Sequence, residues 1–487
     1  MDKLLAFFDK LDSVMYFPIL IIVLVAAAIF FTARTRFAQV RLFKEACHLI
    51  MEPPQEAGSI SSFQALIVST ASRVGTGNIV GVSSAICLGG PGAAFWMWLL
   101  ALLGSASAFF ESTLAQIYKR KNKETGESYG GPAYYIEGAL HSKGLAMAFV
   151  VFLILTYAVG FNLLCSYNLQ STFAIYEFYN PKTTPIIIGL ILAAIVGFCL
   201  MGGGKRIIKV ASVLVPVMGV LYVLAALIVI CFHIKYVPTM FKLIFEDAFN
   251  FKAIFGGLSG SCMVYGIKRG LYSNEAGVGS APNASASANV SHPVKQGLVQ
   301  VISVFIDTLL LCTATAFMCL GSGILPSAEL DGAPYVQHAL TTVFGRFGPV
   351  FITISMILFA FTTLIGNLYY VDNGLAYLNG KKMPSKKFMR IFYVFATLVV
   401  FLGAISKASL AWAIADIFMG FMTLINIPAC MRLNATVVKA LKDYEEQKKA
   451  GKDPVFHAAD IGLDPATLDY WKDEPVGEPV SADISDV

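Results

Sequence analysis

The sequence predicts an all-α polytopic membrane protein with about 11 membrane-spanning helices. Of its 487 residues, 56% are hydrophobic and only 14% are charged, which is far more apolar than an average soluble domain. The apolar stretches run to about 20 residues or more, the length that a helix needs to cross about 30 Å of hydrocarbon. Because these stretches lack the regular polar alternation of β-barrel strands, we expect the spans to be helices.

The candidate spans follow one another along nearly the whole chain. They lie at approximately 16–33, 59–88, 92–118, 145–176, 184–201, 209–232, 253–280, 296–320, 342–376, 388–404 and 408–432. From them we expect an N-terminal helix with a basic cytoplasmic loop in residues 1–58, two sets of five helices in 59–252 and 253–436, and a polar cytoplasmic tail in 437–487.

Lysine and arginine gather in alternate connections between these spans. The basic connections are Arg34 to Lys44, Lys119 to Lys143, Lys205 to Lys209, Lys268 to Lys295 and Lys381 to Arg390. By the positive-inside rule they are cytoplasmic, which predicts an external N-terminus and a cytoplasmic C-terminus. We expect the plasma membrane as the location, or the inner membrane if the source is Gram-negative. The polar tail beyond about Lys439 is expected to be a mobile appendage.

Glycines interrupt two of the spans, and each of these is the first span of a five-helix set. The glycines are Gly75, Gly77 and Gly81 in one span, and Gly256, Gly257, Gly260, Gly266 and Gly270 in the other. Because each set has an odd number of spans, the two sets run through the membrane in opposite directions. Paired interrupted spans in corresponding positions indicate the binding site of a transporter.

The stretch SRVGTGN, Ser72 to Asn78, explains what such an interruption does. If the helix opens here, backbone groups lose their partners, which is tolerable in hydrocarbon only where they line a cavity or hold a ligand. The half-helix that starts near Asn78 would direct its N–H groups and dipole toward an anion such as a carboxylate, and the carbonyls before it could coordinate a cation. The alternative is that Gly75, Gly77 and Gly81 form a small-residue packing face.

Several longer motifs resemble those of a known family. They are PGAAFWMWLLALLG at Pro91 to Gly104, GIKRGLYSNEAGVGSAP at Gly266 to Pro282, and the shorter RVGTGNIVGV and FTTLIGN. On these motifs the chain resembles the alanine or glycine:cation symporters, also called sodium:alanine symporters or amino acid carrier proteins. The resemblance extends from about Tyr16 to Arg432.

This resemblance implies both a fold and an activity. The fold is that of the neurotransmitter:sodium symporters, two inverted five-helix repeats, here preceded by one extra N-terminal helix. The activity is Na⁺-coupled uptake of a small neutral amino acid, chiefly alanine or glycine, by alternating access. The implied partners are therefore the amino acid, Na⁺ as coupling ion and the lipid bilayer, without an enzymatic reaction or a further cofactor.

Other functional classes have weaker support. The sequence contains no P-loop for ATP, no repeated channel filter or ring of pore acids, and no G-x-S-x-G or H-E-x-x-H motif of an enzyme. The scattered cysteines form neither a disulfide framework nor a metal motif, and nothing indicates a nucleic-acid partner. An ion gradient must then drive transport, and proton coupling is the alternative to Na⁺ because Arg73 could stand in for a cation.

The resemblance also implies a sodium site. Carried over position by position, its ligands are the backbone carbonyls of Ala71, Val74 and Phe359 and the hydroxyls of Thr362 and Thr363. Na⁺ is a hard cation that takes oxygen ligands, so converging carbonyls and hydroxyls suit it. The alternative is that the two threonines bond back to their own helix, as is common in membrane spans.

A substrate site follows from the same comparison. Its implied residues are Thr76, Gly77, Asn78, Cys165, Ser259, Gly260, Ser261, Thr363 and Asn367. The chain departs from the family at two of them, because many members have glutamine in place of Cys165 and tryptophan in place of Asn367. These changes reshape the pocket, so a larger or more polar amino acid such as glutamine or serine is an alternative substrate.

Two charged motifs near these sites need partners or roles. Arg73 lies inside a span, where an unpaired charge is costly, and we expect it to pair with Glu111 as a structural contact or as a gate. Asp307, Asp372 and Asp416 are other acids within spans. In the stretch Ser273 to Glu275, the side chains are expected to cap a new helix, with a role in the inner gate as the alternative.

Overall fold

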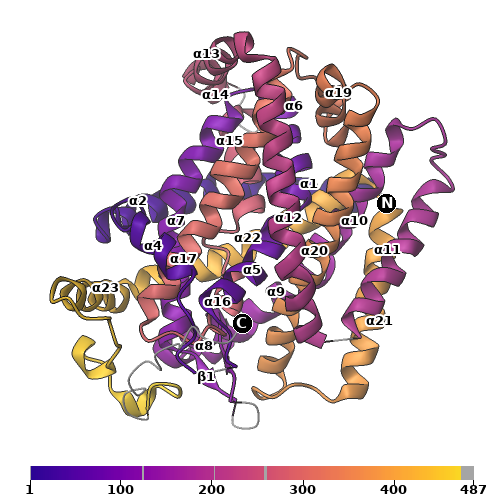
Figure 1. Cartoon of the computed structure of the whole chain (residues 1–487). Coiled ribbons are helices and arrows are strands. Elements are labelled where there is room, and N and C mark those ends of the chain that lie inside the picture. Colours follow the sequence, from indigo (N-terminus) through magenta and orange to yellow (C-terminus); the bar gives the residue numbers. More distant parts are fainter. Residues whose placement is uncertain (1, 57, 123–125, 202, 257–259, 473–487) are drawn as a thin grey trace, which may run out of the picture.

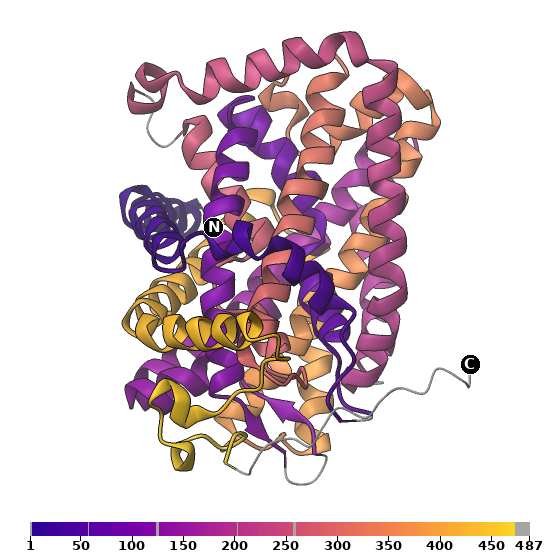
Figure 2. The same ribbon diagram turned by 60° about the vertical axis from the view of Figure 1, so that its left-hand side comes forward.

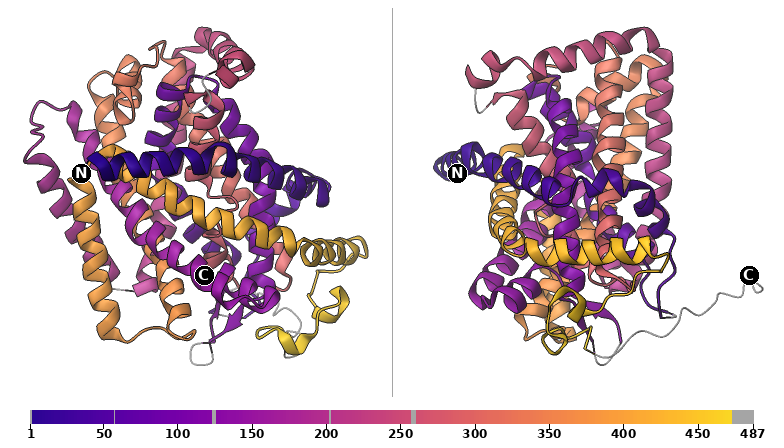
Figure 3. Two further views of the ribbon diagram at one scale, coloured as in Figure 1. Left: turned by 180° about the vertical axis from the view of Figure 1, so that it is seen from behind. Right: turned by 90° about the vertical axis from the view of Figure 1, so that its left-hand side faces the viewer.

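The computed structural model describes residues 2–472 except 57, 123–125, 202 and 257–259, and it consists almost entirely of helices (Figure 1). The N-terminal elements are α1 (Asp2–Val14), the π-helical turn η1 (Met15–Leu20), α2 (Ile21–Arg34), α3 (Ala38–Arg41) and α4 (Phe43–Ile50). Figure 3 shows α1 and α2 lying across the long helices rather than alongside them. The N-terminal helix is therefore placed on the outside of the helical bundle.

The first predicted set of helices begins with the interrupted span. Its elements are α5 (Ser62–Arg73), η2 (Gly77–Gly81), α6 (Val82–Gly89), α7 (Ala93–Ile117), the two-stranded hairpin β1 (Arg120–Lys121) and β2 (Ser128–Tyr129), α8 (Pro132–Leu140), α9 (Lys143–Ile154), η3 (Leu155–Gly160), α10 (Phe161–Ser171), η4 (Thr172–Ile175), α11 (Thr184–Leu200) and α12 (Gly203–Phe232). A capping box starts α5, in which Ser61 and Gln64 each accept a hydrogen bond from the other's backbone N–H.

The second set continues to residue 432. The elements η5 (Ile234–Tyr236) and α13 (Val237–Ala248) still belong to the first predicted set, which was expected to extend to residue 252. The elements of the second predicted set are α14 (Phe251–Gly256), α15 (Cys262–Asn274), α16 (Ala281–Ser285), α17 (Pro293–Val304), η7 (Phe305–Cys312), α18 (Thr313–Gly321), η8 (Ala328–Leu330), α19 (Ala333–Phe344), α20 (Phe347–Leu378), α21 (Lys386–Ala404) and α22 (Ala408–Arg432). After it come α23 (Asn434–Lys449), η9 (Ala458–Ile461) and η10 (Pro465–Thr467).

Helix length and hydropathy support a smaller number of spans than the sequence predicts. Among the described residues, seven helices are individually long and apolar enough to cross a membrane, or eight if a pair bent by 78° within 216–248 forms one span. The two glycine-interrupted spans do not qualify because each is divided into short helices, and α11 has only 17 residues. The protein is a helical polytopic membrane protein, and the number of eleven spans and the inverted repeat stay predictions.

The helices pack closely through small residues, and their outer faces are apolar. A side chain at Gly160 would meet the backbone of Ala415, and one at Gly403 would meet the backbone of Leu163, as expected where membrane helices associate through small residues. Large hydrophobic side chains on α11, α12 and α21 are exposed, including Phe198 and Val394. Such faces suit contact with lipid.

Two predicted loop residues lie inside the protein. Lys268 and Arg269 belong to α15, and their side chains are only 12% and 7% exposed. The prediction of a basic connection starting at Lys268 is therefore wrong at its first two residues. Both cations form ion pairs with Asp416. A rule that assigns charged residues to loops does not take such pairs into account.

The segment after residue 433 differs from the expected mobile appendage as far as residue 472. Figure 2 shows α23 and the chain after it lying at the end of the bundle that carries β1 and β2. Trp471 donates its indole N–H to the carbonyl of Gln116 (3.0 Å). The Lys119 ammonium lies 3.9 Å from the centre of the Tyr470 ring and donates to the carbonyl of Ala288 (2.9 Å).

His292 links α23 to the start of α17. Its Nδ1 accepts from the backbone N–H of Val294 (3.2 Å), which places the proton on Nε2, 3.1 Å from the Asp443 carboxylate. Burial lowers the pKa of His292 and outweighs Asp443, which acts to raise it. Burial also acts to raise the pKa of Asp443, but hydrogen bonds from His292 and Gln447 outweigh it and hold this pKa below its usual value.

We expect α23 to dock less stably in acid. Because the pKa of His292 is lower in the folded state, its contribution is complete above the unfolded value of about 6.5 and is lost as the pH falls below it. Asp443 acts in the same direction at lower pH. Proteolysis after residue 433 should be faster at about pH 5.5 than at about pH 7.5, with a protease that is active at both. In His292→Asn, which keeps an N-cap acceptor, this difference should disappear, and its persistence would assign the effect to another group.

Candidate functional site

The first interrupted helix opens where its sequence indicates. Helix α5 ends at Arg73, Val74 has an extended conformation (φ −73°, ψ 95°), and the chain becomes helical again from Gly77. The Asn78 side chain accepts from the backbone N–H of Gly75 (2.8 Å), which supplies one of the partners lost at the break. The absence of side chains is needed here, because a Cβ on Gly75 would overlap the Thr363 hydroxyl and one on Gly77 would lie 2.8 Å from the Tyr272 ring.

A discontinuity that was not predicted lies at Glu275 to Ser280, in addition to the interval between α14 and α15 that contains Gly260. Helix α15 ends with Glu275 in the left-handed conformation, and Gly277 and Gly279 also have positive φ angles of 89° and 92°. The Ser72 hydroxyl donates to Glu275 (3.4 Å), so this discontinuity adjoins the break in the first helix. The two closely spaced glycines of the NEAGVG sequence are the signal that could have located it.

This arrangement changes which residues of the second helix face the break. Ser261 is the N-cap of α15, where it accepts from the N–H of Val264 (3.3 Å), and it lies roughly 16 Å along the helix from Tyr272. Gly260 precedes it and is exposed, and Ser259 lies outside the described residues. The structure therefore brings Tyr272 and Ser273 to the break, and it does not bring Gly260 and Ser261 there.

Ser273 to Glu275 also differ from the expected helix start. They form the end of α15, where the Asn274 side chain accepts from the N–H of Ala276 (3.0 Å). Ser273 donates to the Asp307 carboxylate (2.8 Å). These residues consequently close one helix and connect it to another, and their role in a gate stays a prediction.

The implied sodium ligands lie on two helices that touch. The Thr363 hydroxyl approaches the carbonyl of Val74 (3.4 Å) across the contact between α20 and the end of α5. On the same contact, Gly366 packs against the backbone of Ala71 and Ser72. A carbonyl freed by the helix break and a hydroxyl from a facing helix are suitable oxygen ligands for a hard cation.

Thr362 has a different environment from Thr363. Its hydroxyl donates to the carbonyls of Leu358 (3.0 Å) and Phe359 (3.1 Å) in its own helix. This is the alternative expected for a membrane threonine. The hydroxyl of Thr362 and the carbonyl of Phe359 are thus bonded to each other, while Val74 and Thr363 meet across two helices.

The other implied substrate residues surround the break and are buried. Thr76 accepts from the Asn168 amide (3.2 Å), and the Cys165 thiol lies 3.5 Å from the carbonyl of Ala360. Asn367 accepts from Ser72 (2.8 Å) and donates to the Asn162 side chain (3.0 Å). Asn168 was not predicted, although its position three residues after Cys165 places both on one face of α10.

Asn78 belongs to a polar cluster on the other side of the break. Its amide donates to the Asp307 carboxylate (2.7 Å) and to the Ser273 hydroxyl (3.1 Å). Asp307 also accepts from Thr308 (2.8 Å), and the Cys312 sulfur lies 3.3 Å from the Asn78 amide. Asp307 was noticed as an acid within a span, but its contact with the broken helix required the fold.

The expected direct pair between Arg73 and Glu111 is not formed in the described part of the chain. Arg73 donates to Gln300 (3.2 Å), while Glu111 accepts from Asn426 (2.8 Å) and from the N–H of Gly277 (3.4 Å). Arg73 nevertheless interacts electrostatically with Glu111, Glu275 and Asp307. One guanidinium therefore serves several buried carboxylates instead of one, since these carboxylates lie on different elements around it.

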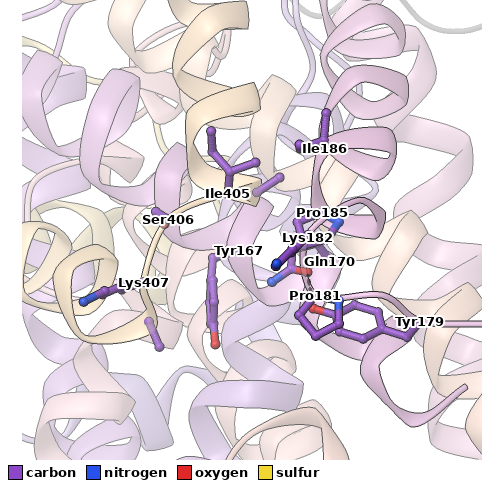
Figure 4. Close-up of a pocket in the computed structure, with 12 residues that line it drawn as sticks. Tyr167, Gln170, Tyr179, Pro181, Lys182, Pro185, Ile186, Ile405, Ser406 and Lys407 are labelled. Atoms are coloured by element: carbon purple, nitrogen blue, oxygen red, sulfur yellow. Dashed lines mark hydrogen bonds between the residues drawn. The ribbon is translucent and has the colours of Figure 1, made fainter.

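Figure 4 shows the residues that line an open cavity of about 540 Å³. Residues of α10, of the connection before α11 and of the turn between α21 and α22 line it, including Tyr167, Tyr179, Lys182 and Lys407. None of the implied sodium or substrate residues lines this cavity. The helix break, and not this open cavity, is the candidate functional site.

Interrupted helices that meet at a buried polar site within a helical membrane protein define the class of secondary transporters. Residues 1–458 match the model of the sodium:alanine symporter family, and the chain belongs to this family. The family is one of Na⁺-coupled amino-acid symporters, and the membership confirms the resemblance seen in the motifs.

Individual relatives differ in the substrates that their names state. The chain is 43% identical over 449 residues to the probable sodium/glutamine symporter GlnT of Bacillus subtilis, covering 92% of each chain. It is 35% identical over 454 residues to the sodium/alanine symporter AgcS of Methanococcus maripaludis, covering 91% of this chain and 97% of that one. A crystal structure of MhsT in complex with L-phenylalanine matches 80% of this chain and 93% of its own with a TM-score of 0.55 at 14% identity, which supports the fold alone.

Proposed function

We propose that this protein carries one neutral amino acid into the cell together with Na⁺ by alternating access at the break between Val74 and Thr76. The observation that supports this most is the approach of the Thr363 hydroxyl to the Val74 carbonyl beside the break. Ion and substrate would then share one discontinuous helix. Each would order groups that the other needs, so each would raise the affinity for the other.

In this proposal Ala71, Val74, Phe359 and Thr363 supply the sodium ligands, and the Thr362 hydroxyl stays bonded to its own helix. The amino acid lies against Thr76, Gly77 and Asn78, with its carboxylate at the N–H groups where the helix resumes. Cys165, Thr363 and Asn367 border the same space. We add Asn168 and Tyr272 to this set, because Asn168 donates to Thr76 and the Tyr272 ring lies against Gly77.

The substrate class extends from alanine and glycine to more polar neutral amino acids. Cys165 is small, and Asn367, Ser72 and Asn162 form a line of polar side chains beside the break. Such a polar lining binds serine or glutamine better than a purely apolar pocket of the same volume would. The similarity to a probable glutamine symporter agrees with this direction.

The deciding experiment measures uptake of radiolabelled amino acids into proteoliposomes. An inward Na⁺ gradient should drive uptake, and a K⁺ gradient should not. A panel of alanine, glycine, serine, threonine and glutamine then ranks the substrates, and alanine equal to or better than the polar substrates would contradict the extended class. Uptake driven by a pH gradient without Na⁺ would show that a proton is the coupling ion. Arg73 and the carboxylates around it would then be the residues to examine.

The orientation belongs to the same proposal. We place the N-terminus outside and the C-terminus in the cytoplasm of a cell membrane, with α23 and the β1–β2 hairpin on the cytoplasmic side. The concentration of lysine and arginine around residues 34–44, 119–143 and 381–390 supports this. Labelling of single cysteines introduced near each terminus of intact cells would test it.

A further inference from the structure

A buried ion-pair cluster joins the N-terminal helix to the second interrupted helix. The Lys268 ammonium forms ion pairs with Asp12 of α1 and with Asp416 of α22 (2.9 Å to the latter). Arg269, the next residue of α15, also pairs with Asp416 (3.2 Å). The side chains of Asp12 and Lys268 are only 17% and 12% exposed, and Asp416 is almost completely buried.

The charges of this cluster balance only if Asp12 is present. Lys268 and Arg269 supply two positive charges, whereas Asp416 supplies one negative charge that both cations share. Asp12 supplies the second. Removing one partner from a buried ion pair leaves a costly uncompensated charge, so without Asp12 the two cations would compete for Asp416.

Arg269 connects this cluster to the candidate site through two aromatic rings. Its guanidinium lies 3.5 Å from the centre of the Trp412 ring, a close cation–π contact. Trp412 packs edge to face against Tyr272 with ring centres 5.0 Å apart. Tyr272 in turn packs against Gly77 and interacts with the Thr76 side chain.

From this continuous path we infer that Asp12 is a positioning residue for the transport site. By neutralising Lys268, Asp12 leaves Asp416 free to hold Arg269, and Arg269 holds Trp412 and Tyr272 against the helix break. The helix that precedes the two five-helix sets thereby sets the affinity for the transported amino acid. This inference rests on the proposed function, in which Thr76 and Gly77 contact the substrate.

Asp12→Asn tests the inference through the kinetics of Na⁺-driven uptake. Coupling of ordinary strength would raise the KM for the amino acid about fivefold or more, while the maximal rate per folded molecule stays within about twofold. Asp12→Glu, which keeps the charge, should restore KM to within about twofold. Glu246→Gln is the matched control, because Glu246 forms an exposed pair with Lys242 and should leave KM unchanged.

A double variant separates charge balance from simple loss of packing. Asp12→Asn with Lys268→Met removes one charge of each sign, so Arg269 should regain Asp416 and KM should return toward the value of the unchanged protein. A KM that stays high in the double variant would overturn the charge argument. An unchanged KM in Asp12→Asn alone would overturn the inference and leave the proposed function standing.

A spectroscopic measurement tests the same path without transport. The protein has four tryptophans, and replacing Trp96, Trp98 and Trp471 by phenylalanine leaves Trp412 as the reporter of Arg269. Asp12→Asn should shift its emission, and Asp12→Glu should not. An unshifted emission would overturn the inference. If the emission shifts but the unchanged protein shows no Na⁺-driven uptake, the path from Asp12 to Trp412 is supported and only the proposed function is contradicted.

Discussion

Thr363→Val is expected to weaken Na⁺-dependent uptake strongly at ordinary Na⁺ concentrations, while Thr362→Val leaves most of it. Valine has nearly the shape of threonine but lacks the hydroxyl, so each variant removes one oxygen with little change of packing. The Thr363 hydroxyl faces the carbonyl of Val74 at the helix break, whereas the Thr362 hydroxyl is bonded to carbonyls of its own helix. Only the first oxygen is directed toward the proposed ion.

The size of the difference follows from the strength of bonds to charged groups. Losing a contact to a charge costs about 1.5 to 3 kcal/mol, so the Na⁺ concentration for half-maximal uptake should rise about tenfold or more in Thr363→Val. A neutral intrahelical bond contributes about 1 kcal/mol, and Thr362→Val should change the Na⁺ dependence by less than about fivefold. Initial uptake rates measured over a range of Na⁺ concentrations give both numbers. Equal losses would show that Thr362 leaves its own helix to ligate the ion, and no loss in Thr363→Val would remove this site from the mechanism.

A structural feature could be predicted from the sequence where neighbouring residues determine it. The break at Val74 to Gly77 could be predicted because glycine and a charged residue inside an apolar stretch are visible in a few neighbouring positions. The family motifs are equally local. Family membership therefore follows both from the motifs and from the match over residues 1–458.

Contacts between distant segments could not be predicted in this way. From the sequence, Lys268 and Arg269 are assigned to a loop because they are charged. In the structure they are buried, since Asp12 and Asp416 neutralise them. A hydropathy pattern counts charges along the chain, but the cost of burying a charge depends on its neighbours in space.

The carboxyl-terminal segment shows the same limitation. Its polar composition suggested mobility, yet aromatic rings at Tyr470 and Trp471 enclose the buried Lys119 ammonium. A few contacts of this kind are enough to dock a short segment, and the few aromatic residues that make them barely change its average composition. The discontinuity at Glu275 to Ser280 was not predicted for a related reason, since several glycines were available and only the fold shows that Gly277 and Gly279 have positive φ angles.

Gly77→Ala should reduce uptake about tenfold or more, while Gly81→Ala, one helical turn away, should leave uptake within about twofold. A Cβ at Gly77 would lie 2.8 Å from Cε1 of Tyr272, whereas one at Gly81 would lie 3.7 Å from Cδ1 of the same ring, an ordinary contact. Both variants add the same methyl group to the same helix. Since alanine favours helix over glycine by about 1 kcal/mol, Gly81→Ala should not destabilise the protein.

The Tyr272 ring cannot simply move aside from an alanine at position 77. It packs edge to face against Phe161 at 4.8 Å and against Trp412 at 5.0 Å, measured between ring centres. The strain must then displace the chain at Thr76 and Gly77, where the substrate is proposed to bind. Uptake of the best substrate and thermal unfolding of the purified variants should be measured together. Tyr272→Leu in the Gly77→Ala background should recover thermal stability by removing the colliding ring edge, and full activity of Gly77→Ala by itself would show that this close approach is not needed for transport.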